Sequence, residues 1–375
     1  MKNLSFVGPV IRMLRLERNW SMETLCKGIC VVSYLSKIEQ GKTIPNRQII
    51  EDLLQKLGVC WRDEPNMCTL RECLYEGIFS LDHSYFRQQI ELLEKEWNPK
   101  IVGPCYLDFM VIRACYYKQP EWIPRDFLPL MDRRQRCLHA ITLGNYFEAY
   151  NCFPCPLSAY CVGEEAYLKG NYLQAMEYLQ LACDQASREG YAVLTMVCQH
   201  YMANCYSNMG NLDAMNRHNQ VAIRLARLLG DSDMEQTISY NIAAAYTERG
   251  DYEKAYGYFS ALEKCTVYDL HKLAICCEKL GKPEEGLAAL DKADAMTQPD
   301  CLEREMCELV RYRLEHPGYL RDSKYGEVLM SAYRRIRNEK HYGYVRFHLP
   351  WITQWLTANR QYRQAYELLS DFPNI

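Results

Sequence analysis

Apolar residues recur at helical spacing from the first part of the chain onward. Val10, Ile11 and Leu14 fall on one face of a helix, which predicts an amphipathic first segment. Ser21 has the chemistry of an N-cap, since its hydroxyl can accept a hydrogen bond from the next helical turn, and Gly28 ends the second helix. The pattern therefore begins with two short helices joined by a tight connection.

Two further helices are predicted before residue 60. The third runs from about Val31 to Gln40, and Gly41 follows it as a C′ residue; Asn46 then caps the fourth. Leu35 and Ile38 lie three residues apart and share one face of the third helix. Its other side is mostly polar, with Ser33, Tyr34, Ser36 and Lys37. The apolar side of this helix can pack against the other helices, whereas packing gives no role to its polar side.

Residues 7–60 resemble the Xre/Cro-type helix-turn-helix domain of bacterial and phage repressors. The resemblance rests on features that fall in register: Arg15, the Ser21 cap, Leu25, Gly28, the string LSKIEQGK and the loop at Pro45. In that family an arginine of the first helix pairs with a glutamate of the third, which implies a fold-holding pair between Arg15 and Glu39. The second helix of such a unit lies across the DNA backbone, and the third enters the major groove.

The resemblance implies two sets of DNA-binding residues. The candidates for reading bases are Val32, Ser33, Tyr34 and Lys37. Lysine can donate to guanine, serine can bond several bases, and the methyl groups of valine can touch the thymine methyl. The candidates for phosphate contacts, which position a protein without reading sequence, are Lys27, Lys42 and Arg47.

Two positions depart from the pattern of that family. Met22 stands where many members carry a glutamine that contacts the DNA backbone, and Cys30 replaces the usual polar cap of the third helix. Both changes can weaken DNA binding or alter its specificity. A four-helix packing domain that has lost DNA binding is therefore left open as an alternative.

The rest of the chain repeats a pattern of two helices joined by a turn. Five stretches align, at residues 166–182, 205–222, 245–262, 276–293 and 356–372, and a weaker copy spans 140–150. The turn is a Gly followed by Asn or Asp in most copies, usually with an Ala five residues after the Gly. Gly ends one helix, Asn or Asp begins the next, and Ala lets the pair pack closely. The turn residues are Gly144, Gly170, Gly210, Gly250, Gly281 and Arg360.

This pattern is similar to the tetratricopeptide repeat, with its usual period of about 34 residues loosened. The resemblance implies a right-handed superhelix whose concave face is lined by the first helix of each pair. A degenerate pair is expected between about Thr297 and Arg346, and residues 66–140 are expected to form linker helices and irregular early pairs.

Solenoids of this kind usually bind extended peptides. Asn offers both a donor and an acceptor to a peptide backbone, and Tyr adds flat apolar contact. The repeat geometry implies inward positions on the first helices at Tyr160, Glu164, Tyr167, His200, Asn204, Asn208, Tyr240, Asn241, Glu248, His271 and Lys279. Any one of these residues could equally be a solvated or turn residue, so the prediction applies to the set, with Asn204 and Asn241 at its centre.

Length and charge refine this division. A chain of 375 residues suits a small domain followed by a repeat array. Residues 1–65 carry ten Lys and Arg against seven Asp and Glu, whereas the whole chain has a net charge of −3. A basic head on an acidic body indicates, modestly, that a polyanion would meet the head. No apolar run approaches the roughly 18 residues of a membrane span, and charges interrupt the apolar pattern at the start, so a cytoplasmic protein without a secretory signal is expected.

The nineteen cysteines are scattered through apolar helical positions and are interpreted as small core residues of a reducing compartment. The only metal-like spacing is Cys152 with Cys155, followed by Cys161, and no second pair completes a structural zinc site. The sequence also lacks a Gly-rich phosphate loop, a nucleophile elbow and an HExxH helix. We therefore expect no metal, no cofactor and no enzymatic activity.

Together the two parts resemble the RRNPP group of cytoplasmic peptide-pheromone receptors. The resemblance implies an all-α fold, with a helix-turn-helix domain at residues 1–65 and a repeat domain at 66–375 for peptide binding and dimerisation. It implies a transcriptional regulator that is a homodimer, binds duplex DNA at two half-sites, and is controlled by a short signalling peptide on the concave face. We expect the protein not to bind a membrane.

Two other classes remain open. The chain could be a tetratricopeptide adaptor for a protein partner, with a head that no longer binds DNA. It could also act on a partner protein as some tetratricopeptide phosphatase regulators do, although those lack a DNA-binding head and this chain has one. Salt-dependent binding to duplex DNA separates the regulator from the adaptor.

Overall fold

The computed structural model describes residues 4–96, 98, 100–262, 264–340 and 342–370, and these are almost entirely helical. The predicted all-α class is confirmed. None of the described helices is both long enough and apolar enough to cross a membrane. By the density of their contacts the residues form two compact units, residues 1–162 with 181–195 and residues 163–180 with 196–375. The domain boundary predicted at residue 65 stays a prediction.

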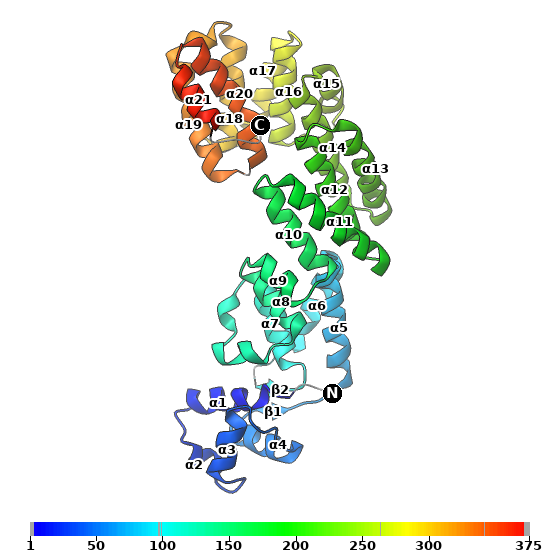
Figure 1. The fold of residues 1–375 in the computed structure, drawn as a ribbon, viewed down its shortest axis with the longest axis vertical. Helices are drawn as coiled ribbons and strands as arrows, with labels where there is room; N and C mark the ends of the chain where they lie inside the picture. Colours follow the sequence, from blue (N-terminus) through cyan, green and yellow to red (C-terminus); the bar gives the residue numbers. More distant parts are fainter. Residues whose placement is uncertain (1–3, 97, 99, 263, 341, 371–375) are drawn as a thin grey trace. The chain divides into compact units, whose positions relative to one another are not determined.

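The first unit begins with four helices, which we call the head (Figure 1). The head consists of α1 (Val7–Glu17), α2 (Met22–Cys26), α3 (Val32–Glu39) and α4 (Arg47–Lys56). After it come β1 (Cys60–Trp61), α5 (Pro65–Phe79), α6 (His83–Glu96), β2 (Ile101–Val102), α7 (Tyr106–Tyr116), the 3₁₀ turns η1 (Pro120–Trp122) and η2 (Arg125–Leu130), α8 (Arg133–Thr142) and α9 (Tyr146–Cys152).

The helix ends of the head follow the predicted capping residues. The Ser21 hydroxyl accepts from the backbone N–H of Thr24 at 3.1 Å, and Asn46 Oδ1 accepts from the N–H of Ile49 at 3.0 Å. Gly41 has a φ of 69°, a left-handed conformation that glycine adopts without strain. One prediction was wrong: the N-cap of α3 is Val31, and no side chain caps this helix, so Cys30 precedes the cap instead of replacing it.

The predicted pair between α1 and α3 is present. Arg15 Nε and Nη2 donate to the two carboxylate oxygens of Glu39 at 2.6 and 2.8 Å, and Nη1 donates to the carbonyl of Trp20. Arg15 and Glu39 are both buried, so the pair forms inside the head and away from its surface. A bidentate pair of this kind fixes the orientation of both side chains and hence the angle between the two helices.

A two-residue parallel strand pair was not anticipated by the helical pattern. Cys60 aligns with Ile101 and Trp61 with Val102, and the N–H of Arg62 donates to the carbonyl of Val102 at 2.9 Å. The segment leaving the head is thereby hydrogen-bonded to the segment that precedes α7. Both segments belong to the first unit.

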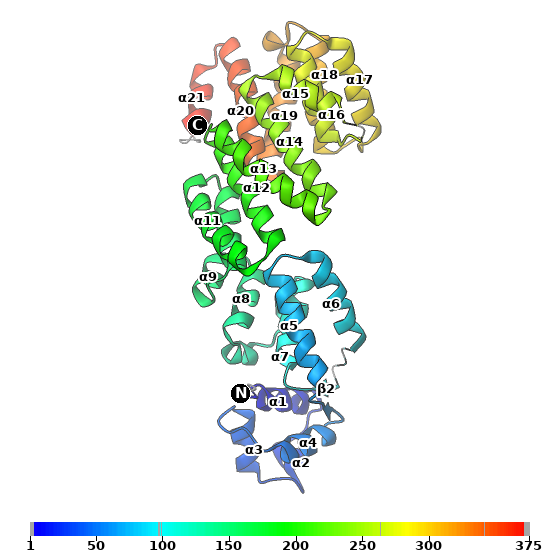
Figure 2. The ribbon, with the colours of Figure 1, turned by 90° about the vertical axis from the view of Figure 1, so that its right-hand side faces the viewer.

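Helix pairs build the rest of the chain (Figures 1 and 2). They are formed by α10 (Pro156–Leu168), α11 (Tyr172–Glu189), α12 (Ala192–Asn208), α13 (Leu212–Leu229), α14 (Ser232–Arg249), α15 (Tyr252–Ser260), α16 (Val267–Lys279), α17 (Pro283–Ala295), α18 (Leu302–Glu315), the turn η3 (Tyr319–Arg321), α19 (Ser323–Glu339), α20 (Tyr342–Ala358) and α21 (Tyr362–Ser370).

The turn residues of the repeat motif are confirmed one by one. All six lie between the two helices of a pair and have positive φ, from 60° at Arg360 to 84° at Gly210. A side chain at Gly210 would also collide with the guanidinium of Arg249. The expected degenerate pair is α18 with α19, which packs on α20 through Leu309, Ala332 and Ile352. Of the last predicted repeat, residues 371 and 372 lie outside the described residues.

Candidate functional site

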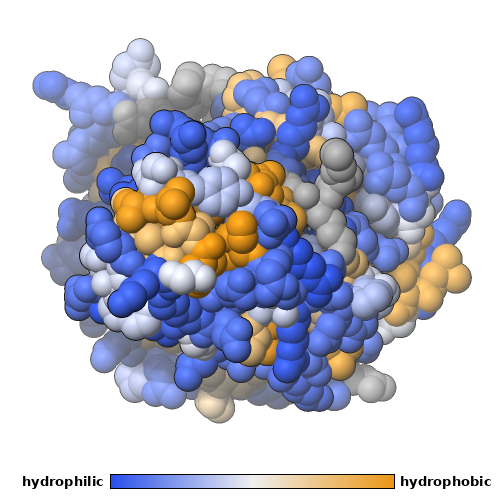
Figure 3. Space-filling view, turned by 90° about the horizontal axis from the view of Figure 1, so that it is seen from below, coloured by the Kyte–Doolittle hydropathy of each residue, from blue (hydrophilic) through white to orange (hydrophobic). Residues whose placement is uncertain are grey.

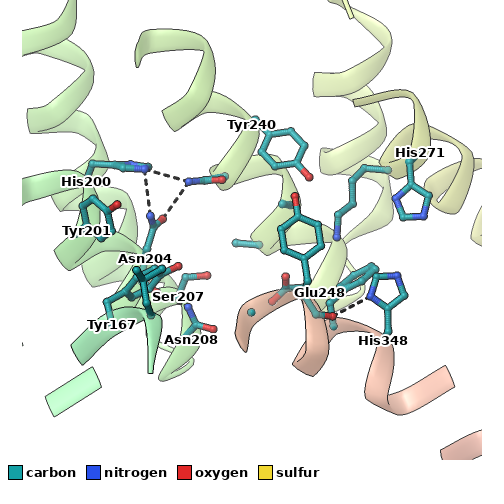
Figure 4. Close-up of a pocket in the computed structure, with 18 of the residues that line it drawn as sticks. Tyr167, His200, Tyr201, Asn204, Ser207, Asn208, Tyr240, Glu248, His271 and His348 are labelled. Carbon is teal, nitrogen blue, oxygen red and sulfur yellow. Dashed lines mark hydrogen bonds between the residues drawn. The ribbon is translucent and has the colours of Figure 1, made fainter. Parts of the chain in front are cut away.

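A pocket of about 270 Å³ lies in the second unit (Figure 4). The first helices of four consecutive pairs, α10, α12, α14 and α16, supply most of its wall, as expected for the concave face of a solenoid. Helix α20 supplies a further wall through Tyr344, Phe347 and His348. The pocket therefore combines residues that are up to about 180 positions apart in the sequence.

Eight of the eleven predicted peptide-binding residues line this pocket. They are Tyr167, His200, Asn204, Asn208, Tyr240, Asn241, Glu248 and His271. In Figure 4, His200, Tyr201 and Asn204 lie at one side and His271 and His348 at the other.

The other three predicted residues are placed elsewhere. Tyr160 is buried in the first unit, with 7% of its surface exposed. Glu164 lies one turn before Tyr167 and accepts a hydrogen bond from the hydroxyl of Tyr201 at 2.5 Å, outside the pocket lining. Lys279 lies at the far end of α16 and lines a second cavity of about 410 Å³. The structure thus does not bring these three side chains into the pocket.

Three polar side chains form a connected group at the His200 side. The side-chain amides of Asn204 and Asn241 both approach His200 Nε2 at 3.1 Å, and Asn241 Nδ2 also lies 3.4 Å from Asn204 Oδ1. An amide nitrogen can only donate, so His200 Nε2 accepts both hydrogen bonds and carries no proton. Burial lowers the pKa of His200 to about 4, which is consistent with a neutral imidazole at pH 7.

The two asparagines of this group keep hydrogen-bonding atoms that are available to an occupant of the pocket. Asn241 uses both of its amide protons, and among the described residues nothing donates to its Oδ1. Asn204 uses one amide proton on His200 and retains the other. One acceptor and one donor therefore remain on neighbouring helices, the pair of groups that a peptide unit requires.

The sequence identified His271 on α16 but missed Lys272 beside it and the contribution of α20. Lys272 is 5% exposed and follows His271, and burial lowers its pKa to about 8. His348 Nδ1 donates to the carbonyl of Tyr344 at 2.8 Å, and burial lowers the pKa of this histidine to about 3. A signal was available in Tyr344, Phe347, His348 and Trp351, an aromatic stripe at helical spacing outside any recognised repeat.

The DNA-binding candidates lie on the surface of the head. Leu35, Ile38 and Glu39 are buried on one side of α3, whereas Ser33 and Lys37 are exposed and Val32 and Tyr34 are half-buried. The two-sided interpretation of α3 is thereby confirmed for packing. Among the phosphate candidates, Lys27, Lys42 and Arg47 are all exposed, and Arg47 pairs with Glu51 at 2.7 Å.

Apolar side chains also reach the surface of the head. Val31 is 67% exposed at the start of α3, and Ile44 is 54% exposed in the loop before α4. Figure 3 shows this side of the molecule, where an apolar patch is bordered by hydrophilic residues. Exposed aliphatic groups can contact the methyl group of thymine.

The cysteines form no metal centre in the described part of the chain. No group of three or more His, Cys, Asp or Glu side chains there could hold a metal ion. Cys155 and Cys161, which belonged to the metal-like spacing, are buried thiols of the first unit.

Comparisons with known proteins agree with the two-part organisation. Residues 11–60 match the family model described as helix-turn-helix. The chain also matches the crystal structure of NprR in complex with its cognate peptide NprX, with 16% identity, a TM-score of 0.55, and coverage of 82% of this chain and 100% of that one. No curated protein matches this chain.

Two further solved structures match at lower TM-scores. The apo form of the quorum sensor NprR from B. thuringiensis has 15% identity, a TM-score of 0.42, and coverage of 81% of this chain and 99% of that one. Aspartyl phosphate phosphatase F from Bacillus subtilis has 15% identity, a TM-score of 0.48, and coverage of 99% and 94%. The protein therefore carries a helix-turn-helix head, and its chain has the fold of NprR.

Proposed function

We propose that this protein is a cytoplasmic DNA-binding transcriptional regulator whose activity is controlled by a short signalling peptide. The observation that carries the proposal is the pocket of the second unit, which leaves the Asn241 acceptor and an Asn204 donor available on the concave face. The fold match to NprR, solved with its cognate peptide, supports a peptide as the occupant. The head supplies the second half of the proposal, because its exposed lysines suit DNA.

The proposed mechanism is linkage between the two sites. A peptide that binds one arrangement of a homodimer more tightly than another shifts the population toward that arrangement. DNA that requires a given spacing of two heads then binds more or less tightly by the same free energy. Two half-sites are proposed because one small head contacts little DNA by itself.

The test measures DNA affinity of the full-length protein with and without peptide. Fluorescence anisotropy on duplex fragments from upstream of its own gene is followed over a series of salt concentrations, and random short-peptide pools are then added. We expect affinity to fall steeply with salt, by a slope close to the number of phosphates contacted, and peptide to change the affinity. No measurable DNA binding at low salt, together with no effect of Lys37→Ala, would contradict the regulator and favour the adaptor.

A further inference from the structure

Three cationic side chains are buried in the described part of the chain, and two of them have carboxylate partners. Arg15 pairs with Glu39 in the head, and Arg313 pairs with Glu278 in the second unit. Lys272 is the third, and no carboxylate of the described residues lies within ion-pair distance of its ammonium group. A buried charge without a counter-ion is unfavourable, so such a group in a pocket is a candidate for binding a ligand.

The surroundings of Lys272 direct its charge toward the pocket. Its Nζ lies 3.0 Å from the centroid of the Phe347 ring, and both residues line the cavity. The aromatic face partly stabilises the cation and offers no hydrogen-bond acceptor of its own. The ammonium therefore retains donors that an occupant of the pocket could satisfy.

The neighbouring histidines do not supply the missing negative charge. Burial above all, together with the positive charges of Lys272 and Arg313, lowers the pKa of His271 well below its ordinary value, and burial lowers that of His348 to about 3, so both imidazoles are neutral near pH 7. Their Nε2 atoms are buried and have no hydrogen-bond partner in the described structure. They add polar positions for a ligand without competing for the Lys272 charge.

Glu248 is the one acidic side chain in the pocket lining. It stabilises the charge of Lys272 through space, yet it is exposed and its carboxylate lies beyond ion-pair distance of that lysine. Solvent weakens its effect on the ammonium group. The pocket thus contains one buried cation, Lys272, and one solvent-exposed anion, Glu248. Replacing each of them therefore tests whether the ligand that binds is negatively or positively charged.

We propose that Lys272 anchors a carboxylate group of the ligand that occupies this pocket. The inference rests on the proposed peptide ligand and makes it more specific: the peptide places either its C-terminal carboxylate or an Asp or Glu side chain against Lys272. Phe347, Tyr344 and Met306 surround this end of the pocket and suit an apolar residue next to the carboxylate. Asn204 and Asn241 at the other side hold the backbone.

Two kinds of probe separate this inference from the proposed function. The first compares N-acetylphenylalanine with its carboxamide at millimolar concentration, and the second compares random short-peptide pools with free or amidated C-termini, each made with and without Asp and Glu. Binding to the full-length protein is measured as a shift in Tm and by titration calorimetry. The variants are Lys272→Met, Lys272→Arg, Glu248→Gln and, as a control, Lys254→Met, whose charge pairs with Asp251 on the surface.

We expect the free acids to bind and the uncharged forms to bind about 10- to 100-fold more weakly. Lys272→Met should remove this preference, Lys272→Arg should retain part of it, and Lys254→Met should change nothing. Glu248→Gln should tighten binding of acids a few-fold, because it removes a like charge. If only pools containing Asp or Glu bind after amidation, the carboxylate belongs to a side chain; if amidation alone abolishes binding, it belongs to the C-terminus.

Two results would overturn the carboxylate anchor. One is equal binding of acids and amides by the wild-type protein; the other is weaker binding of acids by Glu248→Gln, which would indicate a cationic ligand. If peptides bind in either of these ways, the proposed function stands while the anchor fails. If N-acetylphenylalanine binds through Lys272 and no peptide pool binds, the anchor stands and the peptide ligand is excluded.

Discussion

Arg346 of α20 donates through Nη1 to the backbone carbonyl of Asn208 at 2.6 Å and to its side-chain oxygen at 3.0 Å. Asn208 ends α12, so this contact joins helices whose residues are 138 positions apart. It ties α20 to α12 beside the pocket that both helices line. The arginine also satisfies a carbonyl at the helix end, which has no partner within the helix.

Arg346→Ala is therefore expected to loosen α20. A hydrogen bond to a charged group contributes about 1.5–3 kcal/mol, and here two are lost. Hydrogen exchange of α20 amides should become faster, whereas Arg363→Ala, an exposed pair with Glu367, should leave it unchanged. Unaltered exchange in α20 would show that the aromatic packing alone holds this helix.

The Asn204→Ala and Asn241→Ala double variant is expected to lose the response to peptide. Both substitutions remove backbone-binding groups, and they leave His200 Nε2 without its donors, so Tm should fall modestly, by an amount corresponding to about 1–3 kcal/mol. DNA affinity in the absence of peptide should stay at the wild-type value. A full peptide response in this variant would contradict the assignment of this pocket as the peptide-binding site.

Substitutions in the head are expected to separate affinity from stability. Lys42→Ala, at an exposed phosphate candidate, should reduce the salt slope of DNA binding by about 1 and weaken all sequences alike. Lys37→Ala should weaken binding by about 1–3 kcal/mol and relax sequence preference. Lys169→Ala in the repeats is the control. If Lys37→Ala weakened the affinity for every DNA sequence equally, Lys37 would contact a phosphate and not a base.

Arg15→Ala is expected to unfold the head locally. It leaves Glu39 buried without its partner, a change that typically destabilises by about 3–5 kcal/mol. Hydrogen exchange in α1 and α3 should approach that of an unfolded segment, and DNA binding should disappear. Arg47→Ala breaks an exposed pair instead and should leave exchange in these helices unchanged. Protected α3 amides in Arg15→Ala would contradict this role.

Acid is expected to destabilise the second unit. Burial holds the pKa of His200 at about 4 and that of His348 at about 3, below the ordinary value near 6.5, so the unfolded chain binds protons that the folded chain does not. The free energy of unfolding should therefore fall as pH decreases from about 7 toward 4, by up to about 1.4 kcal/mol per pKa unit for each histidine. Measuring Tm between pH 7 and pH 4 tests this prediction, and His348→Leu should make Tm depend less on pH. A wild-type Tm independent of pH would contradict the neutral, buried state.

Most of the local architecture was predictable from the sequence. Turn residues such as Gly210 and Arg360 follow from chain stereochemistry, which acts over a few residues, and all of them adopt the expected conformation. Because turn register also fixes which side of a helix faces inward, Asn204 and Asn241 could be placed on the concave face. The cap of α3 was misplaced by one residue because the family pattern suggested a polar cap that the sequence does not supply.

The far wall of the pocket depends on contacts that no local pattern encodes. The aromatic stripe that contains Tyr344 and Phe347 indicates a packed face of α20, but it does not indicate that this face lies against α12 and α16. For the same reason the sequence did not indicate that Asn208, which lines the pocket as predicted, also accepts a hydrogen bond from Arg346. Lys272 was missed because a lysine within a helical segment ordinarily points to solvent.

The parallel pairing of β1 with β2 has a consequence for dissecting the protein. A fragment cut after residue 65 would keep all four head helices but leave the backbone N–H groups of Cys60 and Arg62 without their acceptors at Lys100 and Val102. It would also expose Phe6, which is buried and stacks near Tyr106. The smallest piece that retains these contacts extends at least through α7, so the head belongs to a larger folding unit than its helix-turn-helix motif.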